Sequence, residues 1–137
     1  MSEPLRAVVI TESLNGGQLP KALRALESRR YPHLLDERTQ VEIIELAVPA
    51  AQGAGVALAL AGAVLPRLYY AHLIDSRQML VAFPDTVVRI GRDNAAAVER
   101  AQSIGALFDI PAGQMRFAEM WDTDHPDAPA QPEAPSR

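Results

Sequence analysis

The 137-residue chain contains no cysteine. This absence excludes disulfide bonds, thiolate catalysis, Cys-x-x-Cys redox chemistry, and zinc or iron–sulfur sites built on sulfur ligands. The one run of other metal-ligating side chains, residues 122–125, lies in a segment whose ordering around an ion would cost conformational entropy. We therefore expect no cofactor and no metal site.

An excess of basic residues is also lacking, because the formal net charge is -4. Proteins that bind nucleic acids normally present a basic face to the phosphate backbone. Arginines do gather between residues 24 and 38, but acidic residues are interleaved with them, which is typical of a solvated face. The charge pattern predicts no nucleic-acid partner.

The beginning of the chain lacks the features of a secretion signal. Residues 1–4 carry Glu3 where a signal peptide needs lysine or arginine, and only a short apolar run follows. We expect a cytoplasmic protein.

Charge is missing altogether from the 21 residues between Leu46 and Pro66. The length suits a membrane span, but alanine and glycine fill more than half of the positions, and alanine gains little on membrane insertion. The strands predicted on either side belong to one sheet, which a span would separate. We therefore predict no membrane segment, and interpret residues 50–72 as a soluble helix.

That helix is apolar on all sides, so it must be buried on more than one side. One side is expected to rest on the sheet. The other, with Val56, Leu60 and Val64, is expected to meet a second copy of the protein in a two-fold dimer. In the alternative interpretation, Phe117 and Trp121 of the same chain cover it.

The remaining chain divides into short segments of clear periodicity. Alternating or β-branched runs predict strands, an amphipathic pattern predicts helices, and Pro84-Asp85 predicts a type I hairpin turn. The predicted elements are strand 5–10, helix 19–30, strand 41–46, helix 50–72, strands 78–83 and 86–90, helix 95–108 capped by Asp93 or Asn94, and either an edge strand or an apolar clasp at 114–121. Residues 66–74 fit either a continued helix or a strand.

The resulting β-α-β-α-β-β-α order, with a parallel βαβ unit at its start, resembles the thioredoxin fold. The resemblance places the redox motif at residues 13–17, where this chain has Ser-Leu-Asn-Gly-Gly, so it implies a domain without redox function. The proline that this fold carries before its third strand is absent at residues 76–77. A ferredoxin-like α+β sandwich, with the apolar helix as an insertion, is the alternative.

One domain is expected over residues 1–121. From residue 122 onward, proline recurs every three residues among aspartate, alanine and glutamine. Such a composition cannot bury a core, so residues 122–137 are predicted to be a disordered tail.

Two groups of residues are candidates for a site. His72, Asp75 and Tyr69 combine a potential general base, a carboxylate to orient it and a potential acid. The Asn15-Gly16-Gly17 turn after the first strand, and Arg89 and Arg92 near a later helix start, are candidate ligand-binding groups because arginine and exposed N–H groups favour anions.

These patterns support two hypotheses. The first is a non-catalytic binding or accessory protein, homodimeric through the 50–72 helix and open to a protein partner. The second is a small cofactor-independent lyase or isomerase that uses His72, Asp75 and Tyr69 in an acid–base pocket.

Overall fold

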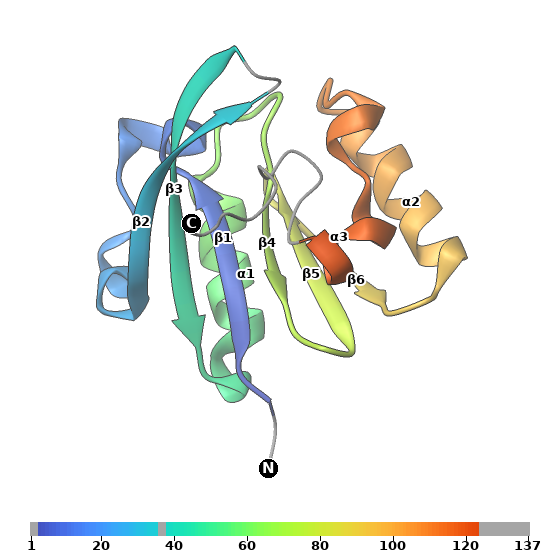
Figure 1. Cartoon of the computed structure of the whole chain (residues 1–137), viewed down its shortest axis with the longest axis horizontal. Helices are drawn as coiled ribbons and strands as arrows, with labels where there is room; N and C mark the ends of the chain where they lie inside the picture. The colour runs from blue at the N-terminus through green and yellow to red at the C-terminus, as the bar shows by residue number, and fades with distance from the viewer. Residues whose placement is uncertain (1–2, 36–37, 124–137) are drawn as a thin grey trace, which may run out of the picture.

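The computed structural model describes residues 3–35 and 38–123. Six strands form one sheet in the order β2-β3-β1-β4-β5-β6, and each neighbouring pair is antiparallel (Figure 1). The strands are β1 (Leu5–Ile10), β2 (Glu27–Leu35), β3 (Thr39–Val48), β4 (Ala71–Ile74), β5 (Gln78–Phe83) and β6 (Thr86–Gly91). The α-helices are α1 (Gly53–Ala63), α2 (Ala95–Ala106) and α3 (Met120–Thr123), and the 3-10 helices are η1 (Thr11–Ser13), η2 (Asn15–Gly17), η3 (Lys21–Leu26), η4 (Ala50–Gln52), η5 (Ala112–Gln114) and η6 (Phe117–Glu119).

The general prediction of a mixed α/β domain is confirmed, but the predicted parallel βαβ unit is wrong. β1 and β3 pair in antiparallel fashion, with Leu5 opposite Val48 and Ile10 opposite Ile43. The reason is that β2 (Glu27–Leu35) forms within the predicted crossover region, so the β2–β3 hairpin reverses the chain before β3 reaches β1. The specific thioredoxin-like order is therefore not confirmed, and neither is the ferredoxin-like alternative.

β2 begins inside the helix that was predicted for residues 19–30. Only Lys21–Leu26 is helical there, as η3, although Leu19 and Leu23 are buried in the core as their spacing suggested. Pro32 fits β2 because this strand is at the edge of the sheet, where a missing backbone N–H removes no ladder bond.

α1 covers one face of the sheet and is shorter than the predicted 50–72 helix. It ends at Ala63, because Val64 has extended backbone angles, and residues 71–74 are β4. Val56, Leu60 and Val64 are buried within the chain, against residues of β1, β3, β4 and β5. The expectation that a second copy covers these three side chains is therefore wrong.

The predicted hairpin of residues 78–90 is confirmed, with Phe83 opposite Thr86. Asp85 has a left-handed backbone (φ 54°), which belongs to a type II turn and not to the predicted type I turn. The predicted cap of α2 is also confirmed, since the Asn94 side chain accepts the N–H of Ala97 at 3.0 Å.

α2 and the chain after it pack on the sheet face opposite α1, where the second apolar cluster lies. Met79 and Phe83 of β5 meet Ala101 of α2 there. The segment 114–121 is the predicted apolar clasp and not an edge strand: η5, η6 and α3 bury Met115, Phe117 and Met120 in this cluster. Phe117 and Trp121 therefore lie on the face away from α1 and do not cover it.

α3 extends to Thr123, two residues into the predicted tail, and residues 124–137 lie outside the described residues. Within the described part of the chain, no helix combines the length and apolar character needed to cross a membrane.

Candidate functional site

His72, Asp75 and Tyr69 do not form the predicted constellation. Residues 71–74 are a strand, so the helical i, i+3 relation between His72 and Asp75 is absent. Oδ1 of Asp75 accepts the backbone N–H groups of Arg77 (2.7 Å) and Gln78 (2.9 Å), which closes the turn between β4 and β5. Tyr69 is half-buried just before β4. Asp75 thus has a turn-forming role, and His72 has other neighbours.

The predicted ligand-binding residues lie in separate parts of the fold. Asn15, Gly16 and Gly17 form the exposed η2 after β1, and both glycines have left-handed backbones (φ 74° and 70°). Nε of Arg89 donates to Gln78 (2.7 Å), and Arg92 donates to the Ser76 carbonyl (3.1 Å). The arginines accordingly bind groups around β5 and β6, at the other end of the sheet from β2 and β3.

A polar cluster that the sequence reasoning missed lies on the sheet face opposite α1, at the β2–β3 hairpin. We call Arg29, Tyr31 and Glu45 the hairpin cluster. Oε2 of Glu45 accepts hydrogen bonds from Nη2 of Arg29 (3.1 Å) and from the Tyr31 hydroxyl (3.0 Å). The Arg29 guanidinium also lies 4.6 Å from the centroid of the Tyr31 ring. Glu45 is buried, so these two donors compensate a carboxylate removed from water.

Two buried histidines share this sheet face. The register aligns Arg29, Glu45, Val8 and His72 in one row across β2, β3, β1 and β4. His33 lies two residues beyond Tyr31 on β2 and therefore on the same face. Neighbouring strands are about 4.8 Å apart, so His72 lies two strand spacings, about 10 Å, from Glu45. His72 is the only residue of the predicted acid–base group that this face brings near another buried ionisable group in the described chain.

The physical environment of Tyr31 differs from that of a free phenol. Burial, followed by the negative charge of Glu45, raises the pKa of Tyr31 to about 12. The hydrogen bond to Glu45 likewise raises the pKa of Arg29. Both groups therefore remain hydrogen-bond donors to Glu45 through the physiological pH range.

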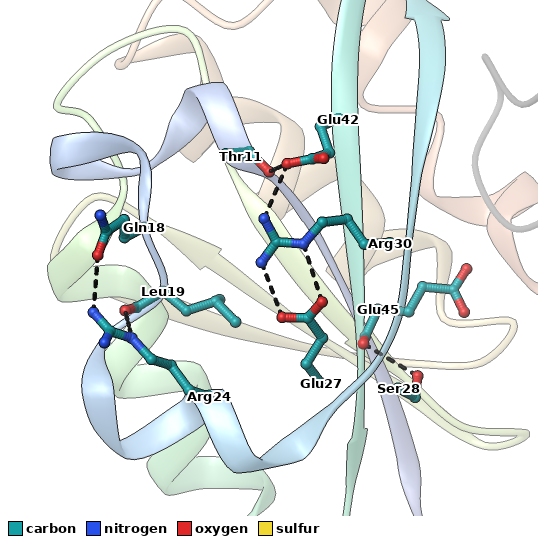
Figure 2. Close-up of polar contacts among 9 residues, drawn as sticks. All are labelled: Thr11, Gln18, Leu19, Arg24, Glu27, Ser28, Arg30, Glu42 and Glu45. Carbon is teal, nitrogen blue, oxygen red and sulfur yellow. Dashed lines mark hydrogen bonds and ion pairs between the residues drawn. The ribbon is translucent and has the colours of Figure 1, made fainter.

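A second ionic cluster lies on the other face of the same hairpin, as Figure 2 shows. Arg30 donates from Nε and Nη2 to the two oxygens of Glu27 (3.0 and 2.9 Å), and from Nη1 to Glu42 (3.0 Å). The Thr11 hydroxyl donates to the same Glu42 oxygen (3.0 Å). These contacts hold the edge strand β2 to β3 and to the end of β1.

The outward side of α1, by which we mean Ala54, Gly55, Leu58 and Gly62, is exposed and uncharged. Leu58 is 64% exposed to solvent. A Cβ atom built on Gly55 or Gly62 would meet nothing within 4 Å, and neither residue has a left-handed backbone. Packing inside this chain therefore does not require either glycine.

No family model matches the chain, and no curated protein or solved structure is significantly similar to it. Among the described residues, no three or more His, Asp or Glu side chains are grouped so as to hold a metal ion. The hairpin cluster, the histidines on its sheet face and the outward side of α1 are the candidate functional features of the described residues.

Proposed function

We propose that this chain is a non-catalytic binding or accessory protein that pairs with a second copy of itself through the outward side of α1. The observation that supports this proposal is the composition of that side. A helix that packs on a sheet normally shows charged or polar residues to water, whereas α1 shows Ala54, Gly55, Leu58 and Gly62.

The two glycines on this side, Gly55 and Gly62, also favour a helix–helix contact. Glycine inside a helix costs up to about 1 kcal/mol relative to alanine, because the unfolded backbone has more freedom to lose. At Gly55 and Gly62 no packing contact within the chain requires the missing side chain, so nothing in the fold offsets that cost. A partner helix can offset it, because a helix without Cβ atoms at these positions allows another backbone to pack at shorter distance.

A second copy is the partner that suits this surface. Two-fold pairing places each surface against its own twin, so a surface with charge of one sign repels itself. The outward side of α1 carries no charge and is therefore electrostatically compatible with itself. Leu58, near the middle of the helix, supplies the large apolar side chain of the contact.

Size-exclusion chromatography with light scattering on the full chain tests this proposal. Wild type is expected at twice the monomer mass, and Leu58→Glu at the monomer mass, because the substitution places two carboxylates in the contact. Leu107→Glu is the matched control: Leu107 is 80% exposed just after α2, on the other side of the sheet, so this variant is expected to remain dimeric. A monomeric wild type, or a dimer that persists in Leu58→Glu, refutes the proposal.

The second candidate is a cofactor-independent lyase or isomerase, now with different partners for His72. It is favoured by the sheet face on which His72 lies in the same row as buried Glu45. Proton abstraction next to a carbonyl would exchange substrate hydrogen with solvent, so incubating a panel of small carbonyl acids with the protein in D₂O and recording deuterium uptake by NMR tests it. His72→Ala should abolish uptake and Asp75→Ala should keep it; no uptake with any compound, or equal uptake in His72→Ala, rejects the enzyme.

A further inference from the structure

Arg29 and Arg30 are neighbours on β2 and point to opposite faces of the sheet, and they use their guanidinium groups differently. All three nitrogens of Arg30 donate to carboxylates, those of Glu27 and Glu42. Arg29 donates from Nη2 to one carboxylate, that of Glu45, and its guanidinium also interacts with the Tyr31 side chain. Among the described residues, Glu45 is the only carboxylate that Arg29 binds. A guanidinium has five N–H donors, so most of those on Arg29 remain for another molecule.

The Arg29 side chain is nevertheless held in place. The buried Glu45 carboxylate binds one end of the guanidinium, and the Tyr31 ring lies 4.6 Å from its central carbon. Stacking of arginine on an aromatic ring and a hydrogen bond to a fixed carboxylate both restrict the rotation of this long side chain. Arg29 therefore pays less entropy on binding than a freely moving surface arginine.

The Arg29 guanidinium is also accessible to solvent. The Arg29 side chain is 60% exposed although its acceptor, Glu45, is only 7% exposed. A structural ion pair that serves only to join two strands has no need of an open, oriented donor set, and the Arg30 cluster already joins β2 to β3.

We propose that Arg29 is the binding residue for an oxyanion, the carboxylate or phosphate group of a small ligand, with Glu45 and Tyr31 as positioning residues. The planar fork of arginine matches the geometry of both anions, and charge-assisted hydrogen bonds of this type are short and strong. The site is independent of the outward side of α1, so it stands whether or not the protein is a dimer.

NMR titration of the ¹⁵N-labelled full chain tests this site through the arginine Nε–H signals. Sodium phosphate and sodium acetate are added separately, each against sodium chloride at equal ionic strength. The expected result is a saturating shift of the Arg29 signal with at least one of the two oxyanions, while the Arg30 signal stays in place; the anion that saturates at lower concentration identifies the ligand class. Arg29 shifts that match those of Arg30, or that chloride reproduces, overturn the proposal.

Two matched variants complete the test, with backbone signals of Tyr31 and its neighbours as the readout. Arg29→Lys keeps the positive charge but loses the fork, and is expected to weaken the oxyanion response about tenfold or more. Arg30→Lys removes the fork of the adjacent arginine and is expected to leave the response unchanged. Equal responses in both variants overturn the proposal, and the wild-type titration remains decisive should either variant fail to fold.

Discussion

α1 and α2 pack on opposite faces of one sheet, and of these two helices only α2 presents charged side chains to water. The inner sides of the two helices are alike: each buries small or apolar residues, among them Leu60 in α1 and Ala101 in α2. The outer sides differ. α2 exposes Glu99, Arg100 and Ser103, whereas α1 exposes Ala54, Gly55, Leu58 and Gly62. Both outer sides would face water in a monomer, yet only that of α1 lacks charge. Because α2 does carry charge, this difference indicates that the outer side of α1 has an environment other than water.

The glycines of the two helices repeat this contrast. A Cβ atom on Gly105 of α2 would overlap the sulfur of Met115 and lie 3.0 Å from the Phe83 ring. That glycine is explained by packing inside the chain. Gly55 and Gly62 of α1 have no such neighbours, so their explanation has to come from outside the chain.

The largest expected effect on stability comes from comparing substitutions on the two sides of α1, at Leu60 and at Leu58. Leu60 is fully buried, and Leu60→Ala is expected to lower the free energy of unfolding by about 2–5 kcal/mol, from lost burial and the cavity left behind. Leu58→Ala is expected to stay within about 0.5 kcal/mol of wild type when the protein is diluted to monomer. Urea unfolding measures both. Similar losses for the two variants would mean that α1 has no true outward side.

A smaller loss is expected from Gly105→Ala. The added methyl forces Met115 and Phe83 to move in a packed core, which typically costs about 1–3 kcal/mol and exceeds any gain in helix propensity. Urea unfolding again provides the measurement. A variant as stable as wild type would show that the cluster under α2 repacks freely, and the contrast between the glycines would lose its basis.

The same substitution in α1 should act in the opposite direction. Gly55→Ala and Gly62→Ala are each expected to raise monomer stability by up to about 1 kcal/mol, because alanine favours the helix and meets no neighbour. Both are also expected to weaken self-association, measured by sedimentation equilibrium, since a Cβ atom holds the partner backbone away. Stabilisation without weaker association would leave the glycines unexplained.

The parts of this fold that are local in sequence could be predicted. The hairpin of residues 78–90 and the Asn94 cap depend on residues within a few positions of one another. β2 could not be predicted in the same way, because Leu19 and Leu23 are spaced as in a helix and do bury their side chains. Tertiary pairing with β3 decides where the strand begins, and propensity alone does not contain that information.

The candidate site shows a related limit. His72 was identified for its proton chemistry, but helical spacing gave it the wrong partner in Asp75. The hairpin cluster depends on the register that places Arg29 opposite Glu45, 16 residues away. A period-two reading of Arg29, Tyr31 and His33 was the available signal, since alternate residues of a strand share one face.

The two faces of the sheet also differ, and the smallest expected effect is a pH dependence of stability that comes from the face toward α2. The face toward α2 continues into the hairpin cluster, where partial burial of the phenol and the charge of Glu45 raise the pKa of Tyr31 to about 12 from an ordinary value near 10. Folding therefore favours the neutral phenol. This contribution to stability is complete below about pH 10, and it is lost as the pH rises through about 12.

Near neutral pH the free energy of unfolding should accordingly show no pH dependence from this group, and Tyr31→Phe should flatten the decline that wild type shows between about pH 10 and 12. Tyrosinate absorbance, recorded as the difference between wild type and Tyr31→Phe, follows the ionisation directly. A Tyr31 step near pH 10 would place the phenol in water, and Glu45 would then lack one of the two donors that justify its burial in the row that it shares with His72.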